Sequence, residues 1–314
     1  MRLITFLPPG GPACGGWLDG SHVMAARAAW DWLRQRDGSP AEPCPVGTGR
    51  MEGLISAPPG FLREFRDSLG GQKPTGVAWP VAAVRLMAPL PRPRTIRDFY
   101  AFEAHVRNAR ARRGLGMIEE WYRFPVFYFS NPNAVFGPGD EVPGPADTRM
   151  LDFELEVAAV LGRSGRNIRA EEAGEYIAGY MIMNDWSARD LQREEMKVGL
   201  GPAKGKDFAT SLGPWLVTPD ELPSDLSLTM TARINGREVS RGNLGDLHFS
   251  FGQMLERASR DCTLYPGEVI GSGTVGTGCL LETEAVPWLQ PGDLVELEVE
   301  GLGLLRNTVG EPLP

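Results

Sequence analysis

The stretch LDFELEVAAVLG, residues 151–162, places two glutamates inside a segment with the composition of a buried β-strand. From Val157 onward it is apolar on both faces, which predicts a strand covered on both sides. Glu154 and Glu156 are two residues apart, so on a strand they point to the same side. A strand at a sheet edge would hold both carboxylates in water. In a buried strand the two would repel and would be costly to desolvate unless a divalent cation offset their charge.

Carboxylate ligands of this kind suit Mg²⁺, Mn²⁺ or Ca²⁺ rather than zinc or copper. The two glutamates alone leave the edge strand and the cation site equally open. Further segments of the chain are needed to decide between them.

The composition is that of a soluble globular protein, with 42% hydrophobic and 23% charged residues among 314. The net charge of −8 argues against nucleic-acid binding, but a small anionic substrate in a locally basic pocket is compatible with it. The start, MRLITFLPPGG, lacks the pattern of a signal peptide, and no apolar run is long enough to span a membrane. The four cysteines form no CxxC pair, which predicts reduced thiols in a cytoplasmic protein.

Local patterns divide the chain near the proline-rich stretch PLPRPRT, residues 89–95, which predicts a hinge. The sequence before it predicts short strands within residues 1–6 and 15–26, helices at 26–36 and 60–69, and mostly loop over 38–60. We therefore expect a small α+β domain over residues 1–90 and a larger domain over 91–314.

The second part is predicted to be rich in strands. We expect an arginine-rich helix over 96–114, extended chain over 123–137, a loop over 137–147, a helix over 170–180 and a strand over 181–185. Alternating patterns predict further strands at 226–236 and 293–301. The expected fold class is α+β with a majority of β-structure.

A second group of polar residues follows an apolar strand in MNDWSARDLQ, residues 183–192. If a helix begins here, Asp185, Arg189 and Gln192 share one of its faces and could form a site. Spacing alone favours a capping aspartate with an ordinary salt bridge. Lys206 lies in the glycine-rich stretch GPAKGKDF, where a single lysine is usually solvated. Trp186 is predicted to be a core residue.

Five stretches together resemble the fumarylacetoacetate hydrolase family, and the chain is similar to its bacterial members. They are DFELEVAAVLG, GYMIMNDWSARDLQ, KGKDFATSLGPW, LYPGEVIGSGTVGTGCLLE and LQPGDLVELEVEGLGLLRN, and the likeness runs from about residue 83 to the C-terminus. The resemblance implies a mixed β-sandwich roll with a smaller N-terminal domain. It also implies a homodimer that needs a divalent cation, with Mg²⁺ expected and Ca²⁺ or Mn²⁺ as alternatives.

The resemblance further implies a role for each of twelve residues. It implies that Asp98, Glu154, Glu156 and Asp185 are the metal ligands, that His105 is a general base oriented by Glu282, that Lys206, Arg189 and Gln192 are donors to substrate oxygens, and that Tyr100, Tyr128 and Thr274 contact the substrate. Without the resemblance, His105 would more simply be a surface histidine on a basic helix.

The implied activity is metal-dependent hydrolysis of a C–C bond in a small 1,3-diketo acid, of the fumarylacetoacetate or acylpyruvate type. A histidine next to a carboxylate suits water activation, which hydrolysis requires. The alternative is an isomerase, decarboxylase or oxo-acid tautomerase of aromatic catabolism that uses the same metal site without activating water.

Overall fold

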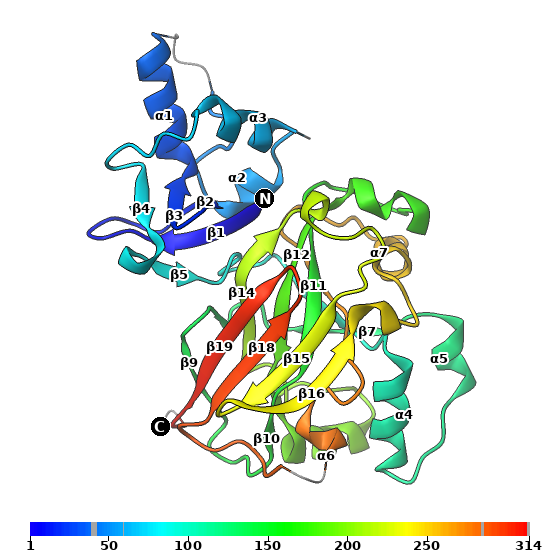
Figure 1. Ribbon diagram of the computed structural model, residues 1–314. Helices are drawn as coiled ribbons and strands as arrows, with labels where there is room; N and C mark the ends of the chain where they lie inside the picture. Colours follow the sequence, from blue (N-terminus) through cyan, green and yellow to red (C-terminus); the bar gives the residue numbers. More distant parts are fainter. Residues whose placement is uncertain (39–42, 59, 284–285, 313–314) are drawn as a thin grey trace.

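A mixed sheet forms the centre of the chain in the computed structural model, which describes residues 1–38, 43–58, 60–283 and 286–312 (Figure 1). Its strand order is β4-β3-β2-β1-β14-β12-β11-β17-β6-β7, with β5 paired to β1 and β8 paired to β14. The strands are β1 (Arg2–Leu7), β2 (Cys14–Asp19), β3 (His22–Ala25), β4 (Ala78–Pro80), β5 (Arg85–Met87), β6 (Ile96–Phe99), β7 (Phe127–Ser130), β8 (Val135–Phe136), β11 (Leu155–Leu161), β12 (Ile177–Asp185), β14 (Thr210–Val217) and β17 (Val269–Gly271).

A second sheet, in the order β16-β15-β18-β19-β9, packs against the first. Its strands are β9 (Glu141–Pro143), β15 (Thr229–Ile234), β16 (Arg237–Asn243), β18 (Leu294–Val299) and β19 (Gly303–Gly310), and β10 (Leu151–Asp152) pairs separately with β13 (Ser187–Ala188). The predicted α+β, strand-rich fold is therefore confirmed, as are the strands expected within 226–236 and 293–301.

Helices lie around these sheets, and α1 and α3 confirm two helices predicted from the sequence. The α-helices are α1 (Ala26–Asp37), α2 (Met51–Ile55), α3 (Phe61–Ser68), α4 (Glu103–Ala111), α5 (Glu119–Arg123), α6 (Arg189–Val198) and α7 (Phe251–Ser259). The 3₁₀ turns are η1 (Val81–Ala83), η2 (Ala170–Glu175), η3 (Pro219–Glu221), η4 (Leu244–Asp246) and η5 (Leu280–Glu282). None of the helices in the described part of the chain has the length and apolarity that a membrane crossing requires.

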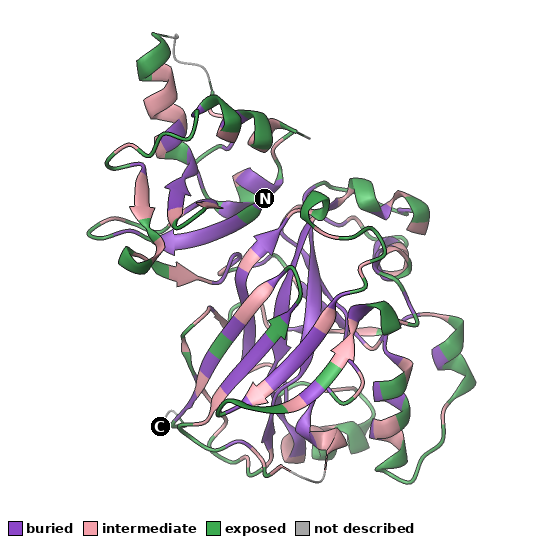
Figure 2. Cartoon of the chain, viewed as in Figure 1, coloured by how far each residue is buried: buried purple, intermediate pink, exposed green. Residues whose placement is uncertain are grey.

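Strand β11 is covered on both faces, as its sequence predicts (Figure 2). Leu155 and Val157 belong to the core that also contains the inward-facing residues of β15 and β18. Ala158 and Val160 point the other way, into a second core shared with the N-terminal elements. Because every residue of β11 is buried, the Glu156 carboxylate on this strand is removed from the surface of the molecule.

The N-terminal elements β1 to β5 and α1 to α3 gather at one end of the molecule (Figure 1). They join the large sheet through β1, which pairs antiparallel with β14 at Arg2 and Leu3. Backbone hydrogen bonds therefore cross from this part of the chain to the rest. The division into domains near residue 90 stays a prediction.

Two local predictions were wrong. Residues 96–99 form β6 rather than the start of a helix, because they pair with both β17 and β7, and such tertiary pairing overrides local propensity. Residues 177–180 belong to β12 and pair with β11, so only a 3₁₀ turn remains of the helix expected over 170–180. The stretch 38–60 is mostly loop in its described residues, as predicted, and contains one short helix, α2; residues 39–42 and 59 lie outside the described residues.

Candidate active site

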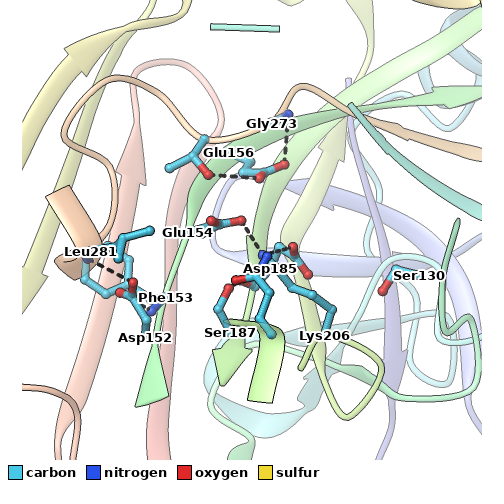
Figure 3. A network of polar contacts seen from close by, with 12 residues as sticks. Ser130, Asp152, Phe153, Glu154, Glu156, Asp185, Ser187, Lys206, Gly273 and Leu281 are labelled. Carbon is cyan, nitrogen blue, oxygen red and sulfur yellow. Dashed lines mark hydrogen bonds and ion pairs between the residues drawn. The ribbon is translucent and has the colours of Figure 1, made fainter. Parts of the chain in front are cut away.

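Four buried carboxylates meet where strands of the large sheet end. Asp98 lies on β6, Glu156 lies on β11, Asp185 is the last residue of β12, and Glu154 immediately precedes β11. One oxygen of each lies within 4.8 Å of the others, and all four residues are buried. Figure 3 shows Glu154, Glu156 and Asp185 directed into this common space. The edge-strand alternative for the glutamates is therefore wrong, because β11 lies inside the sheet.

Gly271, on the strand between β11 and β6, leaves room for the carboxylate cluster. Strand β17 separates β11 from β6, and its Gly271 is opposite both Ala158 and Asp98. A Cβ at Gly271 would lie 2.6 Å from Asp98 Oδ1 and 2.6 Å from the Met183 Cε. Any side chain here would displace the Asp98 carboxylate from the cluster.

Two buried, positively charged side chains balance part of the negative charge of the carboxylates. Lys206 donates to Glu154 Oε2 at 2.6 Å and also to an oxygen of Asp185. Arg189 donates from Nη2 to Glu154 Oε1 at 2.7 Å. Lys206 is thus no solvated loop residue, because only 3% of its surface is exposed. Glu154 is held from both sides by positive charge.

The protonation of the carboxylates differs within the cluster. Burial and the neighbouring Asp185 raise the pKa of Asp98 well above its usual value, and burial together with Asp98 does the same for Glu156. Burial also raises the pKa of Asp185, although Lys206 opposes this. For Glu154, burial is outweighed by Lys206 and Arg189, which lower the pKa. Asp98 and Glu156 consequently retain protons to higher pH than exposed carboxyls do.

The oxygens of this cluster fit a hard divalent cation. Asp98 Oδ1 and Asp185 Oδ1 are buried and have no hydrogen-bond partner among the described residues. Buried carboxylate oxygens without partners are costly, and a cation bound there would remove that cost. Carboxylate oxygens are the donors that Mg²⁺, Mn²⁺ and Ca²⁺ prefer. The cluster could therefore hold such a cation.

A histidine–carboxylate pair forms a second group close to the first. His105, on α4, places its Nδ1 3.0 Å from Oε1 of Glu282, on η5, and both side chains are buried. Cys279 lies in the same cluster, and the Tyr100 ring meets the imidazole edge-on at 5.3 Å. His105 is near enough to Glu154 to help lower the pKa of that residue. The surface-histidine alternative is therefore wrong, because His105 is buried and paired.

Asp152 was not singled out from the sequence, although it continues the alternation of Glu154 and Glu156. Its carboxylate is fully buried and accepts four hydrogen bonds, from the amides of Phe153, Leu280 and Leu281 and from Arg189 Nε. Figure 3 shows Asp152 beside Phe153 and Leu281. Cys279 was also not foreseen, and burial raises the pKa of its thiol well above the usual value.

The remaining predicted residues surround the two groups. The Tyr128 hydroxyl donates to Asp185, and the Thr274 hydroxyl lies 3.5 Å from Glu156 Oε1. Gln192 accepts from Arg189 Nη1 at 3.1 Å through its side-chain oxygen. Burial raises the pKa of Tyr100 to about 12, so its hydroxyl stays neutral.

One proposed arrangement differs from the structure. Asp185 does not share a helical face with Arg189 and Gln192, because it ends β12 and α6 begins only at Arg189. Arg189 nevertheless binds both Glu154 and Gln192, and Lys206 links Glu154 to Asp185. The strand end, rather than a helix, therefore positions Asp185.

Comparisons with known proteins agree with these features. Residues 94–310 match the family described as fumarylacetoacetate (FAA) hydrolase C-terminal. A 2,4-didehydro-3-deoxy-L-rhamnonate hydrolase from Sphingomonas sp. (strain SKA58) is 35% identical over 188 residues, which cover 60% of this chain and 65% of that protein. The rat protein named oxaloacetate tautomerase Fahd2a, mitochondrial, is 31% identical over 236 residues, which cover 73% and 71% of the two chains. The structure of a fumarylacetoacetate hydrolase from Exiguobacterium antarcticum matches with a TM-score of 0.73, 27% identity and 99% coverage of both chains.

Proposed function

We propose, because the chain belongs to the fumarylacetoacetate hydrolase family, that it hydrolyses a C–C bond in a small 1,3-diketo acid. The substrate class is that of fumarylacetoacetate or an acylpyruvate. The observation that carries this proposal is the buried His105–Glu282 pair beside the carboxylate cluster. A base that can activate water beside a cation site is what hydrolysis needs, whereas a tautomerisation consumes no water.

Asp98, Glu154, Glu156 and Asp185 would hold the divalent cation, with Mg²⁺ proposed and Mn²⁺ or Ca²⁺ as alternatives. When bound, the cation would supply Lewis-acid polarisation of the oxo-acid oxygens and would orient the substrate. The Tyr128 hydroxyl and Lys206 fix the Asp185 carboxylate. These side chains therefore define the position of the cluster before any substrate arrives.

His105 is the proposed base. Because Glu282 accepts at the Nδ1 side, the imidazole is held in one orientation, and its Nε2 remains to take a proton from water. The water oxygen bonds to the carbonyl carbon, the adjacent C–C bond breaks, and the departing carbanion takes up the proton. The products are a carboxylic acid and a smaller oxo acid, so the atoms balance with water as the only co-reactant.

Three donors would stabilise the negative oxygens that form. Lys206 has three N–H bonds and uses two of them on Glu154 and Asp185, which leaves one for the substrate. Arg189 uses three of its five N–H bonds within the protein. Gln192 spends its oxygen on Arg189, so its amide nitrogen remains a donor. Donors held in advance at such positions typically contribute more than donors that must reorganise.

A second candidate is a tautomerase of 2-oxo acids. The relative named oxaloacetate tautomerase favours it, since it matches 73% of this chain. Such a reaction moves a proton between carbon and oxygen and leaves the carbon skeleton intact. His105 would then transfer a proton directly to or from the substrate, and water would not be consumed.

One spectrophotometric experiment separates the two candidates. The protein with Mg²⁺ is mixed with fumarylacetoacetate, with several acylpyruvates and with enol oxaloacetate, each with and without EDTA. EDTA-sensitive loss of a diketone chromophore, with carboxylic acid products, supports hydrolysis. Flat traces for every diketone would refute it, and accelerated ketonisation of oxaloacetate alone would establish the tautomerase.

The homodimer is proposed from family membership alone. Light scattering on the purified protein tests it directly. A monomer mass at micromolar concentration would refute the proposal.

A further inference from the structure

We propose that Asp152 is a positioning residue that couples the cation site to the His105–Glu282 pair. The inference rests on the proposed function, in which the carboxylate cluster and the pair act on one substrate. The Asp152 carboxylate accepts its hydrogen bonds from Phe153, Leu280, Leu281 and Arg189. It acts through two other elements, the η5 turn and Arg189.

The first connection runs to η5. The amide of Leu280 donates to Asp152 Oδ1 at 2.7 Å, and the amide of Leu281 donates to Oδ2 at 3.0 Å. These are the first two residues of the three-residue turn that ends with Glu282. Because the turn is short, fixing two of its amides fixes the backbone from which the Glu282 side chain reaches His105.

The second connection runs to the carboxylate cluster. Arg189 Nε donates to Asp152 Oδ2 at 2.7 Å, and the Nη2 of the same guanidinium donates to Glu154 Oε1 at 2.7 Å. A guanidinium is planar and rigid, so anchoring its Nε end sets the direction of the Nη2 end. Asp152 therefore controls where Arg189 holds Glu154.

Both oxygens of the Asp152 carboxylate are used by these connections. Each oxygen of Asp152 accepts two N–H donors: Oδ1 from Phe153 and Leu280, and Oδ2 from Leu281 and Arg189. An asparagine would place its amide nitrogen against two of these donors, whichever way it faced. Asp152→Asn thus keeps the size of the side chain, loses at least one of the two hydrogen bonds to η5, and removes the negative charge that pairs with Arg189.

The experiment measures cation affinity by calorimetry and the steady-state rate at saturating cation, in wild type and in Asp152→Asn. We expect cation affinity and kcat each to fall about 10- to 100-fold, the range typical of residues that orient metal ligands, with little change in KM. The matched control is Asp140→Asn. Asp140 also accepts from an arginine and a backbone amide, Arg85 and Gly137, and neither of these partners belongs to the candidate site.

A double variant separates positioning from a general loss of structure. If Asp152 acts on the rate through Glu282, adding Asp152→Asn to Glu282→Gln should lower kcat by less than about threefold. If the fold-losses in kcat of the two single variants multiply in the double variant, Asp152 does not act on the rate through Glu282, and that part of the proposal is overturned. Unchanged cation affinity in Asp152→Asn would overturn the proposed connection from Asp152 through Arg189 to the cation site.

A measurement on the wild type covers the case in which Asp152→Asn does not fold. Hydrogen exchange of the Leu280 and Leu281 amides is followed with and without Mg²⁺, and exchange in β16 serves as the reference. The coupling predicts slower exchange at these two amides when the cation binds, and equal exchange would overturn it. Cation affinity and exchange do not depend on which reaction is catalysed, so failure of the hydrolase proposal would show separately, as absent turnover of the diketones.

Discussion

Glu156→Gln should remove cation binding while leaving the fold intact. Glu156 is fully buried on β11, and burial together with Asp98 raises its pKa, so in the cation-free protein this residue already tends toward the neutral form. Glutamine has nearly the same shape and is always neutral. Its oxygen can still accept from the Gly273 amide, which donates to Glu156 Oε2 at 3.1 Å. The cluster nevertheless loses one of its four anionic ligands.

The expected effect on thermal stability follows from linkage. A cation present at about 100 times its Kd stabilises the native state by about 2.7 kcal/mol. For 314 residues the entropy of unfolding is about 0.66 kcal/mol per kelvin, so the cation should raise Tm by about 4 °C. Loss of an orienting group alone weakens metal sites by up to about 100-fold, and loss of a ligand should do at least as much. The same cation concentration then contributes about 0.4 kcal/mol or less, which is under about 1 °C.

Differential scanning calorimetry with and without Mg²⁺ measures both shifts. Glu296→Gln is the control, because Glu296 is also a buried strand carboxylate, on β18, but pairs with Arg306 outside the cluster. That variant should keep the full shift. A Glu156→Gln protein whose Tm rises with Mg²⁺ as much as the wild type would refute the ligand assignment.

Three other perturbations have defined outcomes. Lys206→Met removes the ammonium group from Glu154 and Asp185 and should lower the free energy of unfolding in EDTA by about 3–5 kcal/mol. Mg²⁺ should recover part of this loss. Denaturant titration measures both values, and an unchanged free energy of unfolding in EDTA would contradict the prediction. His105→Gln should lower the rate by about 10²–10⁴-fold and keep the Mg²⁺-induced shift in Tm, so activity within tenfold of wild type would count against the base. The raised pKa of Glu156 favours the folded state below the usual carboxyl range and loses that contribution as pH rises. Scans from about pH 5 to about pH 8 should therefore show an Mg²⁺-induced shift that grows with pH, and a constant shift would contradict this.

The strand LDFELEVAAVLG was the most informative part of the sequence, because its burial on both faces follows from the apolar pattern alone. The family resemblance was confirmed by the match over residues 94–310. The strand at Ile96–Phe99 was missed, because its two partners, β7 and β17, come from distant parts of the chain. Local pattern carries no information on such pairings.

The environment of single charged residues was equally inaccessible. Lys206 was expected in solvent by its loop context, and its burial depends on Glu154 and Asp185, which only the folded sheet places beside it. Asp152 could have been found, since Asp152, Glu154 and Glu156 alternate along the chain. What no spacing shows is that it accepts from Leu280 and Leu281, more than a hundred positions away.

The position of β17 between β11 and β6 sets an order for the biosynthesis of the site. Asp98 reaches the glutamates of β11 only across Gly271, and the adjacent ion pair of Arg97 with Glu268 joins residues 171 positions apart. On the ribosome all four carboxylates are translated well before the strand that brings them together. A nascent chain therefore carries its acidic residues without a cation site until β17 emerges, and closing this long parallel pairing belongs among the slow steps of folding.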